Sequence, residues 1–166
     1  MDSTVNYGQE LGPNLIKICK KLLDNQNLCK LLVNTDLEPL NPDYHSDIEN
    51  TMELLGKNIR FIPLVTPDDE TTTSKVVVVF SDSEGDRNFN TEDITVLVYV
   101  YTPYAEWRIA GDTIRPFAIM SEIRKSLQNK RINGLGEIRF EGFNISSLTN
   151  QSGSYLMRFH INAFSE

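Results

Sequence analysis

The sequence has little of what builds disulfide-rich, membrane-spanning or nucleic-acid-binding proteins. Two cysteines among 166 residues cannot form a disulfide scaffold. No apolar run approaches the roughly 20 residues that a membrane span needs, and the first ten residues lack the cationic and apolar regions of a signal peptide. With 16 Lys+Arg against 23 Asp+Glu, the chain also lacks the excess of positive charge that replaces counterions on phosphates. We therefore expect a soluble, intracellular protein that is not a general nucleic-acid binder.

The familiar catalytic and cofactor motifs are missing as well. There is no glycine-rich dinucleotide or P-loop fingerprint, no HExxH, no GxSxG and no CxxC. No histidine is placed to activate a serine as a nucleophile. His45 lies between Asp43 and Asp47, and these three could hold a hard cation, but an ordinary acidic loop is the simpler interpretation. We expect no catalytic residue, no metal and no cofactor, and hence no enzyme.

Enough hydrophobic sequence is nevertheless present for a core. Hydrophobic residues make up 40% of the chain, with 8 Phe and 6 Tyr, which argues against disorder. The length suits one domain, and neither a repeat nor a linker is visible. We expect a single α+β domain over residues 1–166.

Helical spacing of apolar residues marks the first part of the chain. Residues 13–33 are interrupted by a polar stretch near Asn25, which predicts two short helices or one broken helix. Cys19 and Cys29 fall on its apolar sides, and we expect both in the core. Residues 48–55 predict a further short helix.

The best helix signal covers residues 112–128. Asp112 or Thr113 can cap the helix, and Pro116 suits the first turn. Its apolar residues repeat at helical spacing. They are Phe117, Met120, Ile123 and Leu127.

Strand signals dominate the rest of the sequence, where β-branched and aromatic residues cluster. The predicted strands are residues 58–65, 75–80, 94–101, 137–145 and 154–164. We interpret residues 66–75 and 81–93 as acidic loops and residues 34–57 as an acidic, irregular insertion. The order α(α)-β-β-β-α-β-β predicts an α+β fold with a mainly antiparallel sheet of about five strands and helices packed on one face.

Acidic and basic residues are segregated along the chain. Residues 34–53 contain six acids and no Lys or Arg, and residues 66–93 contain eight acids against two basic residues. Residues 107–131 reverse the sign, with six basic residues against two acids. Two interpretations are open. In the first, the charged residues simply lie on solvated loops and on the outer surfaces of helices. In the second, the acidic side of one subunit meets the basic side of a neighbour, as a head-to-tail contact requires.

An aromatic run, Tyr99 to Trp107, lies where a strand gives way to a helix. Trp107 either covers the edge of the core or anchors a subunit contact, because Trp, Tyr and Arg are enriched at interface centres. The candidate contact residues are Trp107, Arg108, Arg115, Arg124, Lys125, Asp82, Glu84, Asp86 and Tyr104.

Three stretches carry a resemblance to a known family. They are Asn27-Leu-Cys-Lys-Leu-Leu32 with Asp36-Leu-Glu-Pro-Leu40, Trp107-Arg-Ile109 with Arg115-Pro116, Ile119, Ile123 and Leu127, and Gly134-Leu-Gly-Glu-Ile-Arg-Phe140. Together with the predicted element order over residues 13–164, they resemble structural proteins of tailed bacteriophages, in particular the tail terminator and tail-completion proteins of the neck.

The resemblance implies a non-enzymatic homo-oligomeric ring in the virion, usually sixfold, assembled in the host cytoplasm. Such a ring ends the tail tube and joins it to the head connector or stopper protein, while DNA passes through the lumen without specific binding. An acidic lumen would not retain DNA. The minimal version of the fold does not need residues 34–53, which could dock a sheath, connector or collar protein.

Two alternatives stay open. The first is another virion position, as a head–tail connector or stopper, or as a baseplate subunit. The second is a small cytosolic α+β enzyme or ligand-binding domain, which would need a pocket lined by residues such as Tyr99, Arg108 and His160.

Overall fold

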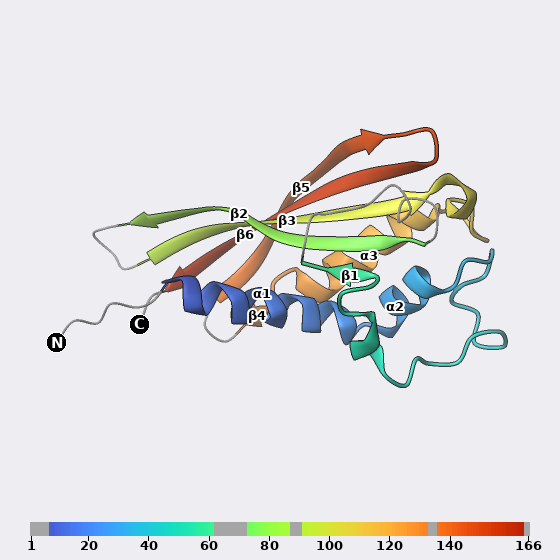
Figure 1. The fold of residues 1–166 in the computed structure, drawn as a ribbon, viewed down its shortest axis with the longest axis horizontal. Coiled ribbons are helices and arrows are strands. Elements are labelled where there is room, and N and C mark those ends of the chain that lie inside the picture. The colour runs from blue at the N-terminus through green and yellow to red at the C-terminus, as the bar shows by residue number, and fades with distance from the viewer. Residues whose placement is uncertain (1–6, 62–72, 87–90, 133–135, 165–166) are drawn as a thin grey trace.

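Three helices cover one face of a six-stranded sheet in the computed structural model, which describes residues 7–61, 73–86, 91–132 and 136–164 (Figure 1). The elements are α1 (Tyr7–Leu23), α2 (Gln26–Val33), the 3-10 turn η1 (Thr51–Leu54), β1 (Ile59–Arg60), β2 (Lys75–Asp86), β3 (Thr91–Pro103), the 3-10 turn η3 (Tyr104–Glu106), α3 (Arg115–Leu127), β4 (Arg131–Ile132), β5 (Gly136–Leu148) and β6 (Ser152–Phe164). The predicted α+β class is confirmed.

The strand order is β1-β2-β3-β6-β5-β4, and every pair is antiparallel except β1 with β2. The short strand β4 makes six described strands where we predicted about five. Strands β2 and β3 stay paired as far as Asp86 and Thr91, so the interpretation as a loop is wrong for residues 81–86 and 91–93, while residues 87–90 lie outside the described residues. A ladder is held by backbone hydrogen bonds, and acidic side chains therefore do not end it. The predicted loop 66–75 lies mostly outside the described residues.

The predicted break near Asn25 is confirmed. The side-chain oxygen of Asn25 accepts a hydrogen bond from the backbone N–H of Leu28 at 3.0 Å and caps α2. The predicted helix 48–55 is only the turn η1. Ile48, where the helix was predicted to begin, instead bonds to the side chain of Gln26. The amide nitrogen of Gln26 donates to the carbonyl of Ile48 at 2.9 Å, and the N–H of Ile48 donates to the amide oxygen of Gln26 at 3.0 Å, and these bonds replace helical ones.

Helix α3 begins three residues later than predicted. Its N-cap is Ile114, which has extended backbone and no side-chain cap, so the expected caps are wrong. Ile114 forms a bridge with Arg108, and the N–H of Arg115 donates to the carbonyl of Trp107 at 2.8 Å. These contacts hold the chain extended up to the helix. Pro116 lies in the first turn, as predicted.

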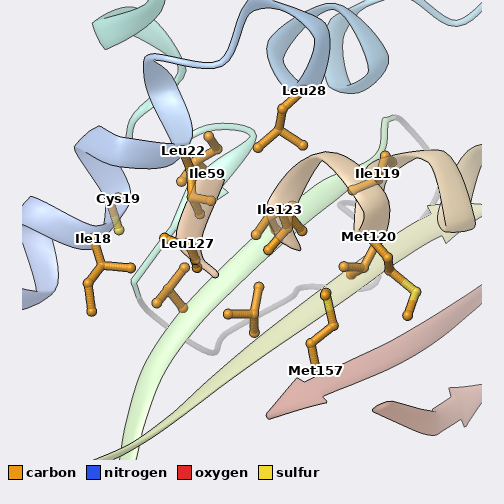
Figure 2. Close-up of a cluster of buried hydrophobic side chains, with 14 of the residues drawn as sticks. Ile18, Cys19, Leu22, Leu28, Ile59, Ile119, Met120, Ile123, Leu127 and Met157 are labelled. Atoms are coloured by element: carbon orange, nitrogen blue, oxygen red, sulfur yellow. The ribbon is translucent and has the colours of Figure 1, made fainter. Parts of the chain in front are cut away.

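The core lies between the helices and the sheet (Figure 2). Alternate residues of β6 face it, and they are Tyr155, Met157, Phe159 and Ile161. Cys19 and Cys29 are both fully buried there, as predicted. Burial raises the pKa of Cys19 to about 12 and that of Cys29 to about 11.

Candidate interaction surfaces

The large apolar side chains that are exposed in the described part of the chain fall into two groups. One group lies in residues 33–53, which we call the acidic segment, and comprises Val33, Leu37, Leu40, Tyr44 and Met52. The other comprises Tyr104, Phe117, Phe143, Ile145 and Leu148, which with Trp107 and Tyr155 form what we call the aromatic surface. Scattered exposed apolar residues need no explanation, but two groups of five mark candidate contact sites.

Ring contacts link the aromatic residues of this surface across η3, α3, β5 and β6, with Trp107 between η3 and α3. The ring centroids of Tyr104 and Trp107 are 5.4 Å apart, and those of Trp107 and Tyr155 are 6.3 Å apart. Phe117 of α3 lies 5.4 Å from Tyr155 and 6.5 Å from Phe143 of β5. These separations are in the range that stabilises aromatic pairs. The contacts join the end of β3, the start of α3 and the β5–β6 hairpin.

A β-bulge in β5 keeps its apolar residues on the helix-facing side. The register shifts between Phe140 and Gly142, so that Phe143 and Ile145 face the same way as Phe140 although they lie three and five residues further on. Gly142 has a φ of +150° and permits this backbone. Phe143 and Ile145 are 52% and 54% exposed. Sequence reasoning missed both, although a glycine within Phe140-Glu-Gly-Phe143 is a signal for a bulge.

Trp107 is held firmly at one end of the aromatic surface. Its indole N–H donates to the carbonyl of Thr102 at 2.8 Å. The ring also packs on the backbone of Gly153, where an added Cβ would lie 2.6 Å from Cζ2 of the indole. Trp107 is half-buried, so it both covers the edge of the core and presents a face to solvent.

A groove of about 260 Å³ continues the aromatic surface between α3 and β5. Its lining residues are Phe117, Met120, Ser121, Arg124, Phe140, Phe143 and Met157. Arg124 is the one charged residue among them, and its guanidinium lies 4.5 Å from the centroid of the Phe140 ring. Within the described residues, the part of β5 from Gly142 to Leu148 pairs with β6 alone, so one strand edge beside the groove is open.

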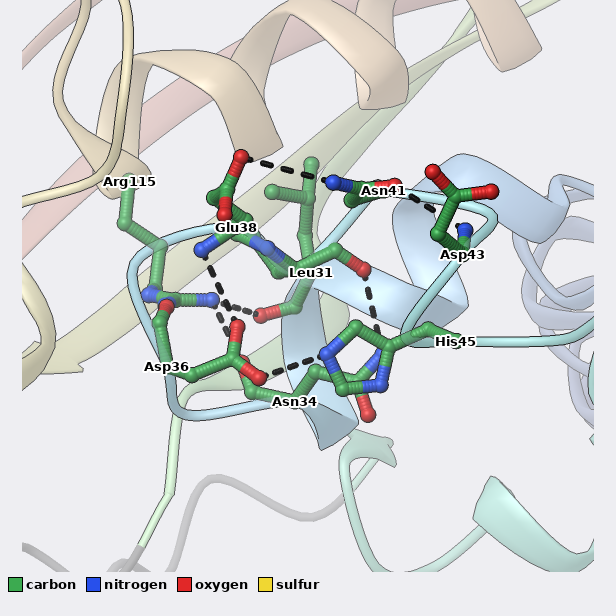
Figure 3. Close-up of polar contacts among 9 residues, drawn as sticks. Leu31, Asn34, Asp36, Glu38, Asn41, Asp43, His45 and Arg115 are labelled. Carbon is green, nitrogen blue, oxygen red and sulfur yellow. Dashed lines mark hydrogen bonds and ion pairs between the residues drawn. The ribbon is translucent and has the colours of Figure 1, made fainter.

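The acidic segment is irregular but held in place from inside by Arg115, whose side chain is fully buried (Figure 3). Nη1 donates to the carbonyls of Leu31 at 2.9 Å and Asn34 at 2.7 Å, and Nη2 donates to that of Asp36 at 2.6 Å. Nε donates to the carbonyl of Glu106 at 2.7 Å. The placement of Arg115 among the surface contact residues is therefore wrong. An irregular loop leaves carbonyls unpaired, and a guanidinium supplies several donors to them.

Further contacts fix the rest of the acidic segment. The N–H of Ala110 donates to the carbonyl of Leu37 at 2.7 Å, and the Lys30 ammonium lies 2.7 Å from the carboxylate of Asp47. The N–H of Tyr44 donates to the carbonyl of Asn41 at 3.1 Å and forms a turn. The ring of Tyr44 is 68% exposed, so an ordered backbone holds this aromatic side chain out into solvent.

The cation-site hypothesis around His45 is not supported. Its Nε2 lies 2.6 Å from Oδ2 of Asp36, while Asp47 pairs with Lys30. Asp43 accepts no bond from His45 and instead donates its N–H to Asn41 at 2.9 Å. Among the residues that the structure describes, no group of three or more His, Cys, Asp and Glu side chains is arranged to hold a metal ion.

The structure brings together some of the predicted contact residues. Trp107 and Tyr104 share the aromatic surface, and Arg124 lines the groove that continues it. Lys125 is exposed and pairs with Glu122 at 2.8 Å, and Arg108 is exposed beside Trp107. The side chains of Asp82, Glu84 and Asp86, which belong to β2, lie outside the described residues.

The residues suggested for a ligand pocket do not converge. Tyr99 and His160 lie on the outer face of the sheet, away from the helices, at separate register positions. Arg108 lies beyond the end of β3. A second groove, of about 290 Å³, lies instead at the end of α1, and it is lined by Lys17, Lys20, Lys21, Asp24, Arg131 and Ile132.

The family model named YomW matches residues 25–161, which include both the aromatic surface and the acidic segment. The chain belongs to the YomW family. No curated protein matches its sequence. In the described ranges, no helix of this YomW-family chain is long and apolar enough to cross a membrane. The family name carries no activity, so a function has to be argued from the two surfaces.

Proposed function

We propose that the chain is a structural subunit of a tailed-bacteriophage neck, where copies of it form a ring that ends the tail tube and joins it to the head connector. The observation that carries this proposal is the placement of two different apolar surfaces. The acidic segment leads into β1, at one edge of the sheet (Figure 1). The aromatic surface joins the chain that follows β3, the start of α3 and the β5–β6 hairpin.

Two unlike surfaces on one subunit are what a head-to-tail contact uses. In such a contact each copy uses one surface to bind the copy before it and the other to bind the copy after it. When the rotation between copies closes, the product is a ring.

The element order and the charge also support the proposal. Two helices, a β-meander, one helix and a closing hairpin make up the order on which the resemblance to tail terminator and tail-completion proteins rests. A net charge of −7 suits a lumen through which DNA passes without being held. The subunit would assemble in the host cytoplasm and remain in the virion, where its partners are the tail tube protein and the connector or stopper protein.

Light scattering on a size-exclusion column, followed by negative-stain microscopy, tests the proposal. We expect closed rings, usually of six copies, either for the chain alone at high concentration or after addition of the tail tube protein. A chain that stays monomeric under both conditions would contradict a ring-forming role. Gold labelling of the virion then distinguishes the neck from the baseplate, where label would favour the other virion position.

One observation favours a ligand-binding function instead. The groove beside α3 is apolar and carries one cation, but its volume of about 260 Å³ is just below the range of about 300–1,000 Å³ that is usual for small-molecule sites. A small molecule retained in native mass spectra of the freshly purified chain would support that function over assembly.

A further inference from the structure

We infer that the acidic segment of one copy binds to the aromatic surface and its groove on the next copy. The inference rests on the proposed function in one respect, namely that the chain assembles with copies of itself. It names which surface meets which, and it holds for a ring at any position in the virion.

The first argument is that the two surfaces together account for the exposed large apolar residues of the described chain. Tyr44, the most exposed of them, stands on a turn of the acidic segment with Leu40 nearby in sequence. An aromatic side chain of this kind buries about 150–250 Å² at low entropic cost, which is typical of an interface anchor. The groove lined by Phe117 and Phe143 is an apolar hollow that can receive the ring of Tyr44.

The second argument is charge complementarity. Residues 34–53 carry six acids and no Lys or Arg, and Asp43, Glu49 and Glu53 among them are exposed. Arg124 is the charged residue of the groove, and the exposed Arg108 follows Trp107. Opposite charges around an apolar contact speed association and fix its register.

The groove at the end of α1 is more basic, yet it fits the acidic segment less well. Its lining contains three lysines and Arg131 but only one apolar residue, Ile132. Docking there would leave Tyr44 and Leu40 exposed to water. The aromatic surface satisfies both the charge and the apolar residues of the segment.

The third argument is that the segment is ordered before it binds. Arg115, Lys30 and Ala110 each tie it to the helices or to the chain that precedes α3. A loop that is already fixed loses little conformational entropy on association, and more of the contact energy then appears as affinity.

Two complementary double variants test the contact. The segment variant carries Leu40→Ser and Tyr44→Ser, and the groove variant carries Phe143→Thr and Ile145→Thr. All four side chains are exposed, so these changes should leave the fold intact, and threonine keeps the strand propensity of β5. Leu97→Thr, at a half-buried position on the outer face of the sheet, is the control outside both surfaces. Circular dichroism and thermal melting verify folding in each case.

Each double variant alone should be monomeric under conditions in which the wild-type chain and the Leu97→Thr control assemble. An equimolar mixture should form dimers with one copy of each variant and no larger species, measured by native mass spectrometry. The reason is that the intact segment of the groove variant can bind only the intact groove of the segment variant. Each such dimer then has no further matching pair of surfaces.

Other outcomes overturn the inference and are separable from a failure of the proposed function. If the groove variant alone dimerises, the acidic segments bind each other. If the segment variant alone dimerises, the aromatic surfaces do. A mixture that stays monomeric while the wild type forms rings places the contact elsewhere and leaves the proposed function standing. A monomeric wild type contradicts both.

A charge-reversal arm separates the two grooves. Arg124→Glu should weaken assembly at least about tenfold and lower its salt dependence, whereas Lys21→Glu in the groove of α1 should change it little. The opposite result, with assembly lost in Lys21→Glu and retained in Arg124→Glu, would move the acidic segment to α1 and overturn the inference.

Discussion

Nη2 of Arg115 donates to the backbone carbonyl of Asp36 at 2.6 Å, although the two residues are 79 positions apart in the chain. The bond joins the first residue of α3 to the acidic segment (Figure 3). It makes an irregular stretch of backbone part of the helical layer, because the guanidinium also binds the carbonyls of Leu31 and Asn34. A single buried side chain therefore determines where the exposed residues of the segment stand.

Replacing Arg115 with methionine should destabilise the fold severely. Arg115→Met removes four hydrogen bonds to backbone carbonyls, and at roughly 1 kcal/mol per bond the free energy of unfolding should fall by about 4 kcal/mol. Urea denaturation measures the loss. Arg108→Met is the control, since Arg108 is exposed and its replacement should stay within about 0.5 kcal/mol. Equal effects of the two substitutions would contradict the anchoring role.

Adding a methyl group at Gly153 should displace the Trp107 ring. The Cβ of Gly153→Ala would meet the indole at 2.6 Å, and overpacking of this kind costs about 1–3 kcal/mol. Trp107 is the sole tryptophan, so its fluorescence emission should shift to longer wavelength as the ring moves toward water. Gly12→Ala is the control, because nothing lies within 4 Å of its Cβ and alanine in a helix should stabilise by up to about 1 kcal/mol. An unchanged emission spectrum for Gly153→Ala would show that the ring is not held on this backbone.

The helices and the centres of the strands could be predicted because they follow local patterns. The polar interruption near Asn25 predicted the end of α1, and clusters of β-branched and aromatic residues predicted the centres of the long strands. Strand ends could not be predicted, since backbone pairing carries β2 through acidic residues to Asp86. The start of α3 was missed for a similar reason, because a bridge between Arg108 and Ile114 holds that backbone extended.

Only some residues of the candidate contact site could be predicted from the sequence. Trp107, Tyr104 and Arg124 were found by residue type alone, since Trp, Tyr and Arg are common in interfaces. Phe143 was missed because the bulge before it changes which side of β5 it faces. Arg115 was misplaced for the opposite reason. An arginine is buried only when tertiary structure collects several acceptors around it, and no local pattern shows that.

Glu106 should make the stability of the fold depend on pH. Glu106 is 7% exposed, and burial raises the pKa of its carboxyl group above the ordinary value. The Ser74 hydroxyl, 3.1 Å away, and Arg115 partly oppose that rise. The folded chain therefore keeps a proton that the unfolded chain has already lost. Its free energy of unfolding should fall as the pH rises from the ordinary glutamate pKa through the folded one.

Glu106→Gln removes this titration and keeps an acceptor for Ser74. Relative to wild type, the variant should gain stability as the pH rises above the ordinary glutamate pKa of about 4, measured by urea denaturation at several pH values. A stability difference between Glu106→Gln and wild type that is constant with pH would contradict the raised pKa.

The two cysteines should be unreactive until the chain unfolds. Burial raises the pKa of Cys19 to about 12 and, together with Asp24, that of Cys29 to about 11. At about pH 8 the reactive thiolate is then a fraction of roughly one in a thousand or less. A thiol reagent should therefore modify neither cysteine in the native chain and both after denaturation in urea.

The sulfur of Cys29 also lies 3.5 Å from the carbonyl of Leu23, at the junction between α1 and α2. Rapid native labelling of Cys29 alone would reveal local opening of this junction, whereas labelling of both at one slow rate would report unfolding of the whole core.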